Sequence, residues 1–163
     1  QELEGVQRTF TSRIAGCQEL DYWERLQKLS LMSLQRRRER YIVLHMWKLL
    51  HGDVSNDIRI EFVERPRTGI KARVPLMKGT SPVGNQSLYD NSFAVMGPRL
   101  WNCLPAQINT IRTFGLFKER LTSFLMLIPD KPPVRGYSTK NSNFILDWRM
   151  DAATTDLCGG QDC

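Results

Sequence analysis

The stretch FAVMGPRLWNCLP, residues 93–105, decides how this chain is expected to fold. Most of its residues are apolar and only one is charged. Pro98 suits the first position of a helix, whereas Pro105 cannot continue one. Gly97 would allow a tight entry in front of Pro98, because it has no Cβ. We therefore predict a short apolar helix of about two turns that starts at Pro98 and has Trp101 as its largest side chain.

Asn102, next to Trp101, does not fit a purely apolar helix. A buried amide without a partner costs roughly 1–3 kcal/mol, so its side chain needs a hydrogen bond. We predict that it bonds backbone and caps the turn before Pro105. The whole stretch would then be the packing hub that seats the last helix of the chain against the longest one.

The charge of the chain is uneven. Residues 1–80 hold 15 of the 23 Lys and Arg residues but 10 of the 17 acidic ones, so most of the net charge of +6 lies there. A basic half favours an anionic partner, and nucleic acid is the commonest such partner inside cells. A basic surface that serves only solubility is the alternative.

Several features favour an intracellular protein. The cysteines are scattered along 163 residues, which favours reduced thiols. No run approaches the roughly 20 apolar residues of a membrane span, and the first residues do not form a signal peptide. The opening, without a Met, looks cut from something longer. We expect no membrane partner and no small-molecule substrate.

Helical periodicity dominates the first third of the chain. Apolar residues at three- and four-residue steps predict an amphipathic helix over residues 2–14, with its arginines on the outer face. Asp21 and Glu24 have the spacing of a capping box and open a second helix, which presents Trp23 to the core. The periodic apolar residues of the first helix are Leu3, Val6, Phe10 and Ile14.

The longest predicted helix has two halves of different character. Ser30 or Ser33 caps its start and Gly52 stops it. Its first half contains RRRER at 36–40, which should reach solvent or a ligand. Its second half is apolar nearly all round and should form the core around Trp47.

The helical period disappears between residues 53 and 92. Alternating apolar residues predict a small β-hairpin at about 58–76, followed by a loop over 79–92. A lone two-stranded hairpin is marginal, so it must lie on the helices or on a ligand.

The last predicted helix covers residues 114–127. Prolines after it begin a tail over 129–163, of which 151–163 should be disordered. The expected fold class is mainly α: a helical bundle-like module of four to five helices with a small β-hairpin and a disordered C-terminal tail. The residues expected to have structural roles are Trp23, Trp47, Pro98, Trp101, Asn102, Pro105, Phe117 and Leu121.

No catalytic or metal-binding constellation is visible. His45 lies on the apolar half of the long helix, where a core role is the simpler interpretation. Cys158 and Cys163 have no partners at zinc-finger spacing. No phosphate-binding loop, catalytic triad or HExxH motif occurs, nor a pair of aspartates for two-metal chemistry. We therefore expect no active site and no cofactor in this chain.

The basic segments are the main functional signal. The arginines of 36–40 span about one helical turn and fan around the helix; their alternative role is a solvated face with Glu39 as a partner. Residues 65–78 contain five cations and no acid, which suits contact with phosphates. The predicted nucleic-acid-binding residues are Arg36, Arg37, Arg38, Arg40, Arg65, Arg67, Lys71, Arg73 and Lys78.

A series of short motifs follows in a characteristic order along residues 2–148. The first are Leu3-Glu4-x-Val6-Gln7-Arg8-x-Phe10-Thr11-x-Arg13-Ile14, Leu20-x-Tyr22-x-x-Arg25-Leu26 with Leu29, and Leu31-x-Ser33-Leu34-x-x-Arg37-Arg38. The later ones are Lys48-x-Leu50-His51-Gly52, Arg67-x-Gly69, Phe93…Pro98-x-x-Trp101-Asn102-x-Leu104-Pro105 and Phe117-Lys118-x-x-Leu121, followed by the tail segment PPVRGYSTKNSNFILDW at 132–148. Together they resemble the region C-terminal to the polymerase core in LINE-type (non-LTR) retrotransposon reverse transcriptases.

The resemblance implies three parts: residues 1–16 as the last thumb-like helix, 17–128 as a post-thumb helical module, and 129–163 as a tail. In that family the region lies next to template and primer. The divalent metal and the paired aspartates belong to the palm, which would precede this chain. The family's catalytic residues therefore have no positions here.

The implied function is a non-catalytic segment of an RNA-directed DNA polymerase that helps to hold nucleic acid. Its partners would be the RNA or DNA backbone and the rest of the reverse transcriptase polypeptide. Two alternatives stay open. The chain could be a structural or protein-interaction module that docks on the missing polymerase core, or a fragment of a decayed element.

Overall fold

The computed structural model describes residues 2–75 and 89–128, which are mainly helical with one antiparallel β-hairpin. This confirms the predicted fold class. The predicted tail over 129–163, including 151–163, and most of the predicted loop over 79–92 lie outside the described residues. In chain order the elements are α1 (Glu2–Ser12), α2 (Tyr22–Lys28), α3 (Leu34–His51), β1 (Phe62–Arg65), β2 (Gly69–Ala72), α5 (Phe93–Asn102), α6 (Ala106–Asn109) and α7 (Phe114–Leu127).

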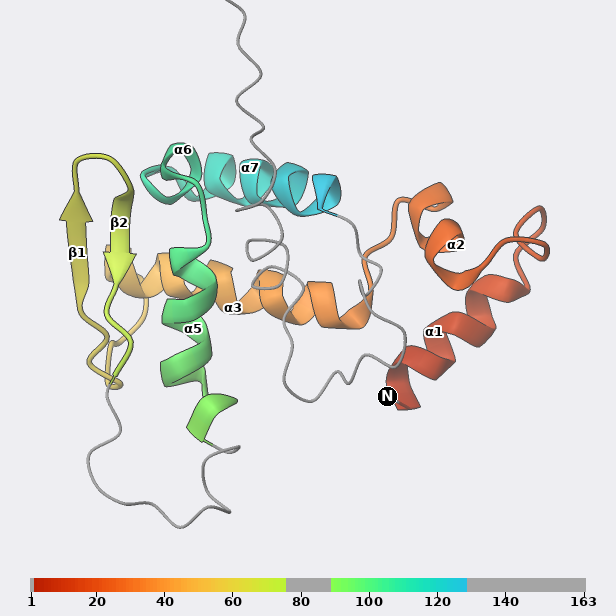
Figure 1. Cartoon of the computed structure of the whole chain (residues 1–163), viewed down its shortest axis with the longest axis horizontal. Coiled ribbons are helices and arrows are strands. Elements are labelled where there is room, and N and C mark those ends of the chain that lie inside the picture. The colour runs from red at the N-terminus through yellow and green to blue at the C-terminus, as the bar shows by residue number, and fades with distance from the viewer. Residues whose placement is uncertain (1, 76–88, 129–163) are drawn as a thin grey trace, which may run out of the picture.

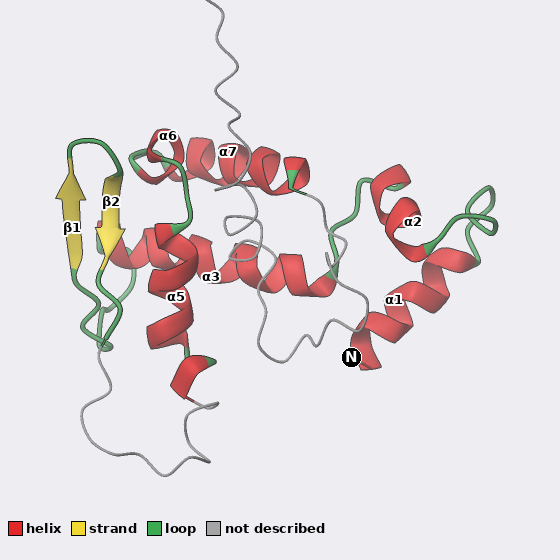
Figure 2. Ribbon diagram, in the orientation of Figure 1, coloured by secondary structure: helices red, strands yellow, loops and turns green. Residues whose placement is uncertain are grey.

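The long helix α3 organises the described part of the chain (Figure 1). Helices α5 and α7 pack against it, and the hairpin packs against α5 and α6. Helices α1 and α2 lie together beyond the N-terminal end of α3, at the opposite end from the hairpin (Figure 2). The described part of the chain is therefore elongated, with the hairpin near one end of α3 and the α1–α2 pair near the other.

The predicted capping signals are confirmed. Asp21 accepts a hydrogen bond from the backbone N–H of Glu24 at 2.8 Å, and the Glu24 carboxylate accepts the Asp21 N–H at 2.8 Å, which is a complete capping box. Ser33 caps α3 by accepting the Arg36 N–H at 3.1 Å. Gly52 ends α3 in the left-handed conformation, with φ of 76°.

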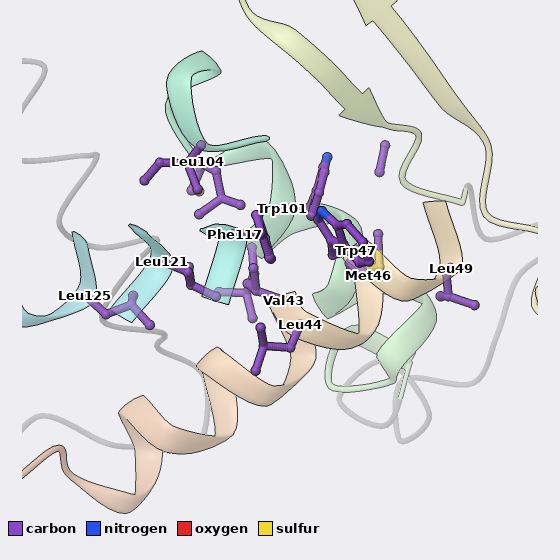
Figure 3. Close-up of a cluster of buried hydrophobic side chains, with 14 of the residues drawn as sticks. Val43, Leu44, Met46, Trp47, Leu49, Trp101, Leu104, Phe117, Leu121 and Leu125 are labelled. Atoms are coloured by element: carbon purple, nitrogen blue, oxygen red, sulfur yellow. The ribbon is translucent and has the colours of Figure 1, made fainter. Parts of the chain in front are cut away.

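Helices α3, α5 and α7 share one hydrophobic core (Figure 3). The Trp101 ring of α5 lies 5.8 Å from Phe117 of α7, which in turn lies 5.9 Å from Trp47 of α3. Trp47 also donates its indole N–H to the carbonyl of Ile111 at 2.8 Å. The aromatic rings thus connect the three helices, and the indole N–H groups of both tryptophans have hydrogen-bond acceptors in the interior.

Pro98 is not the first residue of its helix, so the predicted start of α5 is wrong. The helix begins at Phe93, five residues earlier, and Pro98 lies inside it. A proline there removes one helical hydrogen bond and costs about 3 kcal/mol. Burial of Val95 and Met96 in the core contributes about 1.5–3 kcal/mol each, which offsets that cost. The helix does end at Asn102, before Pro105, as expected.

Gly97 has a different role from the predicted tight entry. It lies within α5, where a Cβ would stand 2.7 Å from the sulfur of Met46 on α3. The absence of a side chain therefore allows α5 and α3 to approach closely.

The hairpin is shorter than predicted, and the described residues contain one helix more than the four to five expected. The side chain of Asn56 bonds both the N–H and the carbonyl of Ile60, at 3.0 and 2.9 Å, and Arg59 has a positive φ of 56°. These features prevent the alternating residues before Phe62 from pairing as a strand. The segment after Pro105, for which no helix was predicted, forms the single turn α6, so the described residues contain six helices.

The close approach at Gly97 generates a stability prediction. Gly97→Ala should lower the free energy of unfolding by about 1–3 kcal/mol, because the added methyl group collides with the buried Met46 side chain. Chemical denaturation followed by circular dichroism measures this change. Gly115→Ala is the matched control: it also lies in a helix, nothing stands within 4 Å of its Cβ position, and it should be neutral or stabilising. Equal effects of both substitutions would contradict the role assigned to Gly97.

Candidate nucleic-acid interface

The hairpin is attached to the helices by side chains that pair with the outer edge of β2. Asn102 accepts the Ala72 N–H and donates to the Ala72 carbonyl, both at 2.8 Å. Asn109 accepts the Ile70 N–H at 3.1 Å, and the Trp101 indole donates to the Ile70 carbonyl at 2.9 Å. The prediction that Asn102 bonds backbone is confirmed, but the bonded backbone belongs to β2 and not to the turn before Pro105.

This attachment changes how the basic residues of the hairpin are used. Lys71 is half-buried and donates to the carbonyl of Asn102 at 2.8 Å, at the C-terminal end of α5. Arg73 forms an exposed ion pair with Glu61 at 2.6 Å. Residues 65–78 contain no acidic residue, but Glu61 and Glu64 lie on the facing strand segment. These two carboxylates partly balance the positive charge of the hairpin.

Two hairpin cations stay at the surface. Arg65 and Arg67 are exposed around the turn between the strands, and no ion pair within the described residues includes either of them. Lys78, the last predicted nucleic-acid-binding residue of this segment, lies outside the described residues. The hairpin thus offers fewer available cations than its sequence suggests.

The run at 36–40 does not lie wholly in solvent, so that prediction is wrong for two of its members. Arg36 and Glu39 are both 0% exposed, with 3.9 Å between their charged groups. They face inward because they stand three residues apart on the core side of α3. Arg38 is exposed, and Arg37 and Arg40 are half-buried.

A group of cations that the sequence does not place together lies where α3 and α7 run side by side (Figure 1). Arg40 donates to the Thr122 hydroxyl at 3.1 Å, and the Lys48 ammonium lies 5.2 Å from the centre of the Phe114 ring. These two contacts show that α3 and α7 are antiparallel. Lys118 stands four residues from both Phe114 and Thr122, so it lies on the same face of α7 as these two residues. We call the following five residues the α3–α7 seam: Arg37, Arg40, Tyr41, Lys48 and Lys118.

The α3–α7 seam is basic without local compensation. No ion pair among the described residues involves any of its four cations. On α3 its members stand at steps of three, one and seven residues, so they share one face over about 16 Å of helix axis. Tyr41 is 65% exposed among them, and the Arg40 guanidinium lies 5.9 Å from its ring centre.

Three of the five seam residues were not predicted from the sequence. Tyr41 and Lys48 follow Arg37 at four and eleven residues, a helical spacing that could have revealed a shared face. Lys118 had no such signal, since only the packing of α7 against α3 brings it to the seam. The consecutive arginines at 36–40 do not share one surface, because neighbours in sequence point in different directions on a helix.

Other chemistry is not apparent in the part of the chain that the structure describes. Within residues 2–75 and 89–128, no three His, Cys, Asp or Glu side chains gather in a way that could hold a metal ion. Both histidines pack against aromatic rings: His45 meets Phe93 edge-on at 5.0 Å, and His51 stacks on Trp47 at 3.8 Å. Of the described helices, none has the length and apolar character needed to cross a bilayer.

Comparison with known proteins adds no relative. The chain matches no family model, no curated protein and no solved structure. Functional inference therefore depends on its own residues and on the order of its motifs.

The burial of Arg36 generates a prediction that separates it from its neighbours. Arg36→Ala should lower the free energy of unfolding by about 3–5 kcal/mol. The substitution removes the buried cation and leaves the Glu39 carboxylate buried without the charge of Arg36 to balance it. Arg38→Ala, on the exposed side of the same helix turn, should change it by no more than about 0.5 kcal/mol. Denaturant titration of both variants measures the difference, and similar losses would show that Arg38 is also part of the packed interior.

Proposed function

We propose that this chain is a non-catalytic C-terminal segment of a retrotransposon-type reverse transcriptase that holds the phosphate backbone of template or primer. The order of the sequence motifs supports the class of parent protein. The observation that carries the nucleic-acid role is the α3–α7 seam, where four cations share one surface without acidic partners among the described residues. The catalytic chemistry would belong to a palm that this chain does not contain.

The seam suits a chain of phosphates better than it suits a single carboxylate ligand. Its cations are spread along two helices and do not converge on one point, so they match a string of charges. Each phosphate neutralised by Lys or Arg releases counterions, which gives an affinity that falls steeply with salt. The exposed Arg65 and Arg67 at the hairpin turn supply a second, smaller group of the same sign.

Charge removal at the seam tests this function. In the variant Arg37→Gln/Lys48→Gln/Lys118→Gln, affinity for a labelled oligonucleotide should fall most at low salt and approach that of the unmodified chain as the salt concentration rises. The slope of log K against log salt should become shallower by about 0.7–0.9 for each phosphate that the variant no longer neutralises, because fewer counterions are released. Fluorescence anisotropy over a series of salt concentrations measures both quantities.

A variant with the same change in net charge is the control. Arg13→Gln/Arg112→Gln/Arg120→Gln removes three exposed cations that are not seam residues; Arg120, the only one on α7, stands two residues from Lys118 and so points to a different side of that helix. Its slope should stay close to that of the unmodified chain. An unchanged slope in the seam variant, or equal changes in both variants, would contradict the proposed interface and favour a basic surface that serves only solubility.

A second candidate function rests on α1, whose apolar face points away from the body. Leu3, Val6 and Phe10 are 70%, 66% and 69% exposed. The sequence pattern predicts that these residues are covered and that the arginines lie outside. The apolar stripe is present as predicted, but nothing in the described part of the chain packs on it.

Polar contacts hold α1 in this orientation. The Glu4 carboxylate accepts hydrogen bonds from the Tyr22 hydroxyl and from the Leu34 N–H, the latter at 3.0 Å. The Gln7 amide donates to the Met32 carbonyl at 3.2 Å, and the buried Thr11 hydroxyl accepts from Arg25 at 3.3 Å. Because the polar face is used internally, the exposed apolar face favours a protein-interaction module that docks on the polymerase core.

Removal of the apolar stripe tests this candidate. Leu3→Ser/Val6→Ser/Phe10→Ser should abolish co-purification with a palm–thumb fragment of a LINE-type reverse transcriptase, because the docking face loses its apolar area. Pull-down after co-expression measures the interaction. Leu116→Ser/Met126→Ser/Leu127→Ser, which changes three exposed apolar residues of α7, should leave it intact. Retention of binding by the α1 variant would exclude this face as the docking surface.

A further inference from the structure

We infer that the α3–α7 seam binds single-stranded nucleic acid, with the ring of Tyr41 stacking on one base. This inference rests on the proposed nucleic-acid function and deepens it by naming the form of the ligand. It depends on one side chain, Tyr41, whose position the packing of the protein does not explain.

Tyr41 is exposed where the other large aromatic residues of the core helices are covered. Its exposure is 65%, against 4% for Trp47 on the same helix and 0% for Trp101. The only ring interaction of Tyr41 among the described residues is with the neighbouring Arg40 guanidinium, at 5.9 Å. A broad ring face is therefore open to solvent near the middle of α3.

The cations around Tyr41 are arranged to hold a strand across its ring. Arg37 precedes it by one helical turn, and Lys48 follows it by about two turns on the same face. Arg40 lies beside it and is held by Thr122 of α7 at 3.1 Å. A backbone that contacts Arg37 and Lys48 would pass directly over the aromatic ring.

A single strand fits this arrangement better than a duplex. In a duplex the bases are paired and stacked inside, so an aromatic side chain on a helix surface has no base face to meet. In a single strand every base has an open face, and stacking on an aromatic side chain is worth about 1–3 kcal/mol per base. Cations on both sides of an aromatic ring are the usual means by which proteins track a single strand.

The experiment compares two substitutions at Tyr41 on four probes of equal length. The probes are a labelled single strand, prepared as RNA and as DNA, a single strand in which every base is replaced by an abasic residue, and a duplex. Tyr41→Phe keeps the aromatic ring, whereas Tyr41→Ser removes it. Because the side chain is exposed, both variants should keep the helical content and thermal midpoint of the unmodified chain, which circular dichroism checks.

We expect the unmodified chain and Tyr41→Phe to bind the base-containing single strand with similar affinity. Tyr41→Ser should bind it about 5- to 150-fold more weakly, the equivalent of 1–3 kcal/mol. On the abasic strand all three proteins should bind alike, because only the phosphates are contacted. The duplex should bind more weakly than the single strand and show no dependence on residue 41.

Two results would overturn the inference in different ways. If Tyr41→Ser binds the base-containing strand as well as Tyr41→Phe while charge removal at the seam still weakens binding, the seam contacts phosphates alone; the proposed function then survives and the base-stacking role falls. If the unmodified chain binds none of the probes, the proposed function itself fails, and the inference fails with it.

Discussion

The pairing of Trp101 and Asn102 with the open edge of β2 is the interaction on which the arrangement of this protein depends. A two-stranded hairpin is marginal by itself, and its outer edge carries backbone groups that must find partners. Here an indole and two amide side chains supply those partners, at distances of 2.8–3.1 Å. Trp101 of α5 also faces the core and is 0% exposed, so the hairpin and the helices are stabilised as one unit.

This attachment also decides where positive charge remains available. Once β2 lies on α5, Lys71 reaches the carbonyl of Asn102, and Arg73 pairs with Glu61 across the hairpin. On α3, burial of Arg36 and Glu39 removes another cation from the surface. Arg65 and Arg67 at the hairpin turn stay exposed, as do cations along α3 and α7, where no acidic side chain of the described residues pairs with the seam. A basic surface thus arises on elements that are far apart in sequence.

The described part of the chain presents two unlike surfaces. The α3–α7 seam is basic with an exposed aromatic ring, whereas α1 exposes an apolar stripe because its polar side chains are bonded to α2 and to the start of α3. The two proposed roles, nucleic-acid contact at one surface and protein docking at the other, use different residues and are compatible with each other. Neither role needs an active site in this chain.

The sequence by itself determined the features that depend on residues close together in the chain. The capping box at Asp21, the stop at Gly52 and the extent of α7 follow from local hydrogen bonding and periodicity, and they are as predicted. Tertiary structure alone decided the rest. Helix α5 continues past Pro98 because its apolar residues are buried against α3. Packing also buries Arg36 and leaves Arg38 exposed, although the two arginines belong to the same run in the sequence. The physical reason is that burial and charge pairing depend on contacts between distant segments, which local propensity does not contain.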